Sequence, residues 1–148
     1  MTNTNDVSVL NGLIETTLDS MKGYEDAAKD AESTQYATMF ADFARDRAQV
    51  ATELQGQVRA LGGEPELDSS MLAAAHRTFM DLKQAITGKD DTAIIQEVER
   101  GEDHIKAKYE DAMKDTDVSP ATQAIIKDGF ASVREGHDKM SALKHSLT

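Results

Sequence analysis

The stretch STQYATMFADFARDRAQVATELQGQVRALGG, residues 33–63, decides the fold class of this chain. Its large apolar side chains recur at steps of three, four or seven residues, which is the period of one face of an α-helix. They are Tyr36, Phe40, Phe43, Val50, Leu54, Val58 and Leu61. Ser33 or Thr34 can cap the start, and Gly62-Gly63 provides a stop. The stretch therefore predicts one long amphipathic helix at about 34–61.

The same apolar period recurs along the rest of the chain. Start signals stand at Asn5 or Asp6, and at Ser119 followed by Pro120, since proline is favoured at the first position of a helix. We expect four long helices at about 6–31, 34–61, 91–115 and 120–145, and a shorter helix at about 69–87. Each long helix would span about 40 Å at 1.5 Å per residue.

Four helices of matched length predict an all-α fold, a four-helix bundle, in one domain over residues 1–148. The helix at about 69–87 is long enough to cross over much of the bundle and would make the second and third long helices parallel. A simple up-and-down array of five helices remains the competing arrangement, because the spacing of apolar residues does not distinguish the two.

Composition excludes several classes of function. Asp and Glu number 27 against 16 Lys and Arg, a formal net charge of −11, so nucleic acid and anionic membranes would be repelled. The chain has no cysteine, which excludes disulfides and thiolate chemistry. The sequence predicts neither a secretory signal nor a membrane span, because it contains no apolar run long enough for either. We expect a soluble cytoplasmic protein.

Three titratable residues interrupt the apolar stripes. Arg47 stands between Phe43 and Val50, Glu102 between Val98 and Ile105, and His137 between Val133 and Met140. An unpaired buried charge is costly, so each needs a partner. Our favoured interpretation is a buried ion-pair layer, in which Arg47 and Arg134 face carboxylates and His137 adds a hydrogen bond. The layer would comprise Arg47, Glu102, Arg134 and His137, with Glu99, Glu25 or Asp19 as further acidic partners.

The alternative interpretation is a di-iron or di-manganese centre. Such centres take one Glu from each of two helices and a Glu-x-x-His pair from each of the other two. The residues three before the four histidines are Ala73, Gly101, Arg134 and Ala142, so no such pair exists. We therefore favour no metal and no cofactor. The alternative ligand set is Glu25, Glu99, Glu102 and His137.

His76 flanks the stripe of the shorter helix beside Arg77. We interpret it as a histidine satisfied by a carbonyl or carboxylate where that helix docks, with a small pocket as the other possibility.

Three stretches carry a family resemblance: LNGLIETTLDSMKGYEDAA from residue 10, AAAHRTFMDLKQAITGKDD from residue 73 and VERGEDHIKAKYEDAM from residue 98. Together they resemble a bacterial family of ferritin-like four-helix bundles catalogued as a domain of unknown function, over roughly residues 6–144. The resemblance implies a ferritin-like bundle, a cytoplasmic setting and an association with bacterial stress responses. We expect a non-enzymatic structural or adaptor protein, a homodimer; the alternative is a metal oxidase or metal store.

Overall fold

The structure, a computed structural model, describes residues 2–67 and 91–147, and these ranges contain helices and connecting loops. The helices are α1 (Thr2–Asp30), α2 (Thr34–Ala60), α4 (Asp91–Met113) and α5 (Pro120–Leu147). The all-α four-helix class predicted from the sequence is thereby confirmed. The predicted crossover helix at about 69–87, with His76 and Arg77, lies outside the described residues.

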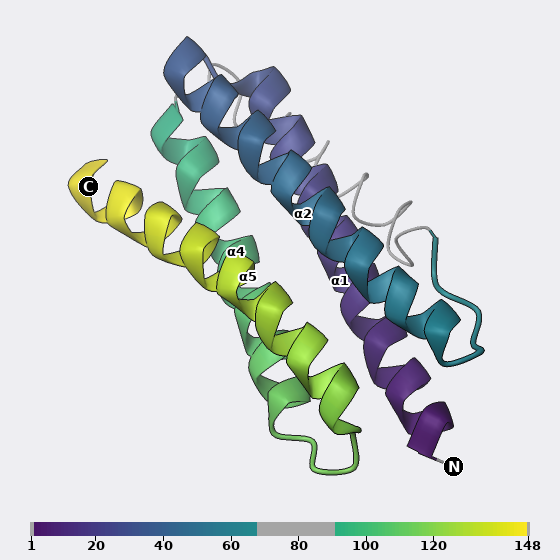
Figure 1. Cartoon of the computed structure of the whole chain (residues 1–148). Helices are drawn as coiled ribbons and strands as arrows, with labels where there is room; N and C mark the ends of the chain where they lie inside the picture. The colour runs from purple at the N-terminus through teal and green to yellow at the C-terminus, as the bar shows by residue number, and fades with distance from the viewer. Residues whose placement is uncertain (1, 68–90, 148) are drawn as a thin grey trace.

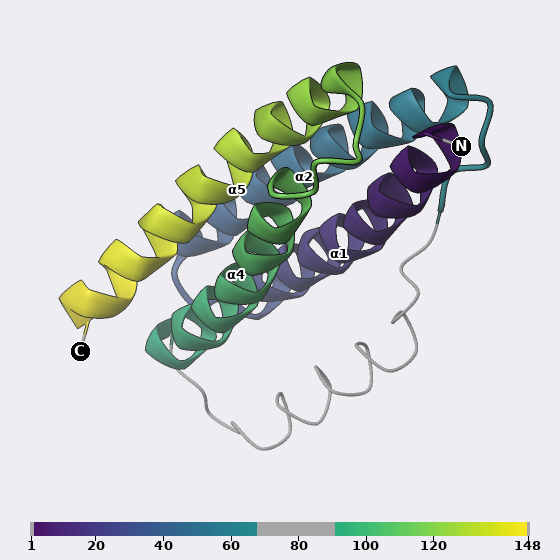
Figure 2. The same ribbon diagram turned by 90° about the horizontal axis from the view of Figure 1, so that it is seen from below.

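The four helices pack as a closed ring. α1 contacts α2 and α4, and α5 contacts α4 and α2. Neighbouring helices run in opposite directions (Figure 1). Seen after a rotation of 90°, α4 lies between α5 and α1 (Figure 2). Since α1 packs directly on α4, and α2 on α5, the helices in the described ranges form a four-helix bundle.

The start of α1 differs from the prediction. Asn5 or Asp6 was expected to cap this helix, but α1 already begins at Thr2 and both residues lie inside it. The Asp6 carboxylate acts instead at the start of α5, where it accepts hydrogen bonds from the Ser119 backbone N–H at 3.1 Å and from Thr122 Oγ1 at 2.9 Å. A capping residue of one helix is therefore supplied by another helix.

Two apolar clusters fill the bundle. One includes Leu10, Ile14, Leu54, Val58, Ile105, Tyr109, Ile126 and Val133. The other includes Tyr24, Ala27, Phe40, Ala44, Ile94, Ile95 and Met140. Each fully buried large apolar side chain stabilises the fold by about 1.5–3 kcal/mol. On every helix a polar or small residue separates the two clusters, so a distinct layer lies between them.

None of the helices in the described ranges contains a stretch long and apolar enough to cross a membrane.

Candidate functional site

A buried ion pair lies in the layer between the apolar clusters. Arg47 of α2 donates to both carboxylate oxygens of Glu102 of α4, from Nη1 to Oε1 at 2.7 Å and from Nη2 to Oε2 at 2.6 Å. Arg47 is 0% exposed and Glu102 is 1% exposed. This parallel, two-bond arrangement matches two nitrogens of the planar guanidinium to two carboxylate oxygens and is the strong form of such a pair.

Residues of α1 complete the surroundings of the pair. Ser20 Oγ accepts a further hydrogen bond from Arg47 Nη1 at 2.6 Å. The guanidinium carbon lies 5.4 Å from the centroid of the Tyr24 ring, within the range of a cation–π contact. The guanidinium is therefore held from two sides, by a carboxylate of α4 and by polar and aromatic groups of α1.

The pKa shifts of Arg47 and Tyr24 follow from the position of these groups beside Glu102. Burial acts to lower the pKa of Arg47, but the hydrogen bonds and negative charge of Glu102 outweigh it and raise this pKa. Burial, and then the negative charge of Glu102, raise the pKa of the Tyr24 hydroxyl, which stays neutral. The layer thus holds a charged guanidinium beside a neutral phenol.

Gly136 of α5 makes room for the pair. A Cβ atom at this position would overlap Arg47 Nη2 and Glu102 Oε2. Sequence reasoning missed Gly136, because a glycine carries no apolar signal. The available signal was its spacing: Gly129 and Gly136 lie on the buried face together with Ile126, Val133 and Met140. The stripe of α5 therefore passes through Gly136, and His137 lies beside it.

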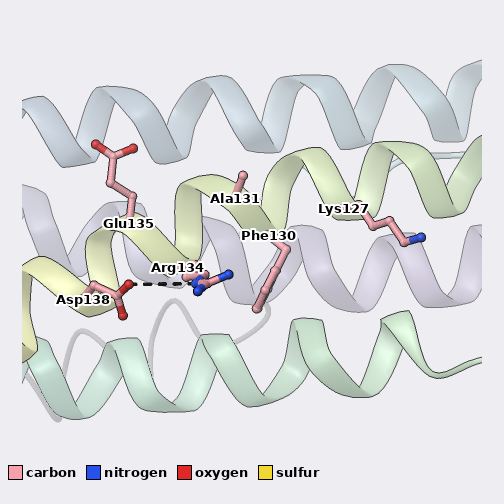
Figure 3. Close-up of a pocket in the computed structure, with 6 residues that line it drawn as sticks. All are labelled: Lys127, Phe130, Ala131, Arg134, Glu135 and Asp138. Atoms are coloured by element: carbon pink, nitrogen blue, oxygen red, sulfur yellow. Dashed lines mark ion pairs between the residues drawn. The ribbon is translucent and has the colours of Figure 1, made fainter.

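Arg134 was expected in the ion-pair layer, and this expectation is wrong. Its side chain is 69% exposed and lies 3.9 Å from Asp138, measured from Nε to Oδ2 (Figure 3). Both residues line a surface hollow along α5 with Lys127, Phe130, Ala131 and Glu135. The reason is helical geometry: Gly136, which faces inward, follows Arg134 by two positions, a rotation of about 200° around the helix.

His137 does not join the layer either. Its Nε2 lies 2.6 Å from Asp103 Oδ1, and its Nδ1 lies 3.4 Å from Asp138 Oδ1. The side chain is 15% exposed, at the edge of the α4–α5 contact. Because Gly136 occupies the inward position, the imidazole is turned toward the carboxylates at this edge and not toward Glu102.

The structure brings only part of the alternative ligand set together. Glu102 is bound to Arg47, and Glu25 lies on α1 with its Oε1 3.9 Å from Lys22 Nζ. Glu99 and His137 do come together, and Asp103 joins them: one ligand atom of each lies within 4.8 Å of the others. Asp103 was missed, although it follows Glu99 by four residues and so shares its helix face.

The residues of the central layer do not fit a di-metal centre. Both oxygens of Glu102 are occupied by a guanidinium, and the space on the α5 side is filled up to the Gly136 backbone. A second cationic centre there would face the fixed positive charge of Arg47. The donors that the ferritin-like arrangement requires, three further carboxylates and two histidines, are not gathered around Glu102 in the described ranges.

Comparison with known proteins identifies the family. A family model described as "Domain of unknown function (DUF2383)" matches residues 5–115. The chain belongs to this family. The resemblance read from the sequence is thereby confirmed. No curated protein matches the chain.

A solved structure supports the fold of this DUF2383 member. It is a two-domain protein from Anabaena variabilis containing dj-1/thij/pfpi-like and ferritin-like domains. The TM-score is 0.78 at 18% sequence identity, and the match covers 100% of this chain and 41% of that one. At this identity the likeness establishes the fold alone, which is ferritin-like. The chain spans well under half the length of that protein.

Proposed function

We propose that this ferritin-like bundle is a non-enzymatic structural or adaptor module, in which a buried charge pair holds the layer that a metal centre would otherwise occupy. One observation carries the proposal: the guanidinium of Arg47 and the carboxylate of Glu102 are fully buried and bound to each other by two hydrogen bonds. The polar groups of the layer are used for packing the bundle, which leaves them unavailable for a substrate.

The accessibility of the pair supports a structural role. Two surface hollows in the described part of the chain, one along α5 and one between α2 and α5, are lined by residues other than Arg47 and Glu102. Catalytic groups need a path to their substrate, and a binding site is a concave region that encloses its ligand. A charge pair sealed between two apolar clusters is suited to fixing the helices against one another.

The adaptor role has support from the similar structure, in which a ferritin-like domain is joined to a domain of another kind. A bundle used in this way is a folded module that another domain or a partner protein can contact.

The proposed setting is the bacterial cytoplasm, with a part in stress responses, as the family resemblance implies. The proposed assembly is a homodimer. Sedimentation at micromolar concentration tests the dimer, which a single species of monomer mass would contradict.

Metal content tests the proposal most directly. Untagged protein from cells grown with added iron or manganese would be dialysed, analysed for elements, and then titrated with Fe²⁺ under nitrogen while absorbance is recorded. We expect no iron or manganese to be retained in a two-to-one ratio to the chain, and no absorption of an oxo-bridged iron pair after exposure to air. Two tightly held ions per chain would instead support the alternative, a di-iron or di-manganese oxidase or store.

A further inference from the structure

A second group of polar side chains lies outside the buried layer, at the edge where α4 meets α5. It consists of Glu99 and Asp103, one turn apart on α4, and His137 of α5. Among the described residues it is the one group of three or more acidic or histidine side chains whose ligand atoms all lie within 4.8 Å of one another. The set contains a nitrogen donor and two oxygen donors from two helices.

We propose that Glu99, Asp103 and His137 bind a single divalent transition-metal ion of the zinc class, which clamps α4 to α5. Zinc accepts histidine nitrogen and carboxylate oxygen at about 2.0–2.2 Å, and sites with three protein ligands complete the tetrahedron with water. This site is separate from the ion-pair layer and goes beyond the proposed structural role.

The distances suit such an ion after small side-chain rotations. Ligand atoms around one zinc ion lie about 3.3 Å apart, as tetrahedral geometry at these bond lengths requires. Asp103 Oδ1 and His137 Nε2 lie 2.6 Å apart as a hydrogen-bonded pair, so they must separate slightly. The Asp103 side chain is 58% exposed and has room to move. An ion bound here takes the place of the proton shared by these two atoms.

The surroundings of His137 favour metal binding at Nε2. A histidine that binds metal through one ring nitrogen usually places the other against a carboxylate or carbonyl, which fixes the tautomer and the ring orientation. Asp138 Oδ1 lies 3.4 Å from His137 Nδ1. Asp138 is held in turn by Arg134, whose Nε lies 3.9 Å from Oδ2. The exposed Arg134 thereby has a role outside the layer in which it was expected.

Lys144 supplies the positive charge that lies beside the Glu99 carboxylate. Its Nζ lies 3.3 Å from Glu99 Oε1, and Glu99 is 8% exposed. A nearly buried carboxylate requires a compensating cation, and the lysine ammonium provides one. The Lys144 side chain is 41% exposed, so it can turn toward solvent when a metal ion takes over that role.

The test is calorimetric titration of untagged chain with Zn²⁺ alone. We expect one ion per chain. His137→Ala should weaken binding by at least about tenfold, because even loss of a neighbouring carboxylate such as Asp138 typically costs 10–100-fold. His145→Ala is the matched control, since His145 is also a histidine of α5 but its Nδ1 lies against the Ser141 carbonyl oxygen, 2.7 Å away. Equal Zn²⁺ affinities of the two variants would overturn the proposal.

Two further measurements keep the result independent of folding. Zn²⁺ should raise the thermal midpoint of the unsubstituted chain and of His145→Ala, but not that of His137→Ala, because an ion that binds the folded state stabilises it. Lys144→Gln should bind Zn²⁺ more tightly, since the competing ammonium is removed. An affinity that falls or stays constant in Lys144→Gln would contradict the placement of the ion beside Glu99.

Discussion

At the scale of single residues, the absence of a side chain at Gly136 matters as much as the charges beside it. Arg47 and Glu102 reach each other across the bundle because α5 presents backbone at this level. Interiors are packed densely, so an added carbon has to displace its neighbours. Here the neighbours are two hydrogen-bonded charged groups whose geometry allows little adjustment.

Gly136→Ala should therefore destabilise the fold, although alanine is the better helix former. Overpacking typically costs about 1–3 kcal/mol, while the gain in helix propensity is at most about 1 kcal/mol. Gly101→Ala in α4 is the matched control, since its Cβ would meet nothing within 4 Å. Urea unfolding should show a loss for Gly136→Ala and a gain of about 0.5–1 kcal/mol for Gly101→Ala. Equal effects would show that the pair does not fill this space.

Glu102→Ala tests the pair itself. Removal of one partner leaves the Arg47 guanidinium buried without its carboxylate, which should cost about 3–5 kcal/mol in the free energy of unfolding. Glu97→Ala is a suitable control, because Glu97 forms a surface pair with Arg100, whose side chain is 71% exposed. Surface changes stay within about 0.5 kcal/mol. A similarly small loss for Glu102→Ala would contradict a buried, coupled pair.

At the scale of elements, the carboxylate of Asp6 joins α1 to the start of α5. It is fully buried and accepts from the Ser119 backbone and from the hydroxyls of Ser119 and Thr122. Burial acts to raise the pKa of Asp6, but these hydrogen bonds outweigh it and hold the pKa below its usual value. The start of α5 is thereby fixed by a residue more than a hundred positions away in the chain.

Asp6→Ala should reduce stability at neutral pH by about 1–3 kcal/mol, because the buried Thr122 hydroxyl loses its acceptor. A carboxyl whose pKa is lower in the folded state stabilises the fold fully above its unfolded pKa, about 3.9. This contribution is lost as the pH falls through the folded value. The difference between the two proteins should thus be constant from neutral pH down to about 5 and shrink below about 4.

Urea unfolding over this pH range checks the expectation, with the exposed Asp128→Ala as control. A difference between Asp6→Ala and the unsubstituted chain that grows toward acid pH would mean that Asp6 is not held as a carboxylate by α5.

Particular residues show which features of the fold and of the polar layer can be predicted from the sequence. Apolar periodicity is a local property, so it revealed the helix at 34–61 and the anomalous charges Arg47 and Glu102. Which residues face one another depends on how the helices pack, and apolar periodicity does not determine that packing. Val133 and Met140 are seven residues apart, and both Gly136 and His137 fit between them at helical spacing. Only the packed structure distinguishes them, because the space opposite is already filled by the guanidinium.

At the scale of the whole molecule, the polar layer divides one long core into two apolar clusters. Helices packed through apolar stripes alone can slide by a turn at small cost, since successive turns offer similar surfaces. A buried pair that must meet opposite Gly136 is satisfied in one register. Buried polar groups serve this purpose in some helical assemblies at a cost in stability. We infer the same division of roles here: the clusters supply stability, and the pair supplies alignment.

The double substitution Arg47→Met with Glu102→Leu separates these roles. Replacement of a buried pair by apolar side chains is often neutral or stabilising by about 1–4 kcal/mol, because no charge is left without its partner. We therefore expect the double variant to unfold at equal or higher urea concentration than the unsubstituted chain, in contrast to Glu102→Ala. The signals in its amide NMR spectrum should broaden or double if the helices sample more than one register. A double variant as unstable as Glu102→Ala would show that the pair itself supplies stability. A single set of sharp amide signals would show that the apolar stripes are sufficient to align the helices.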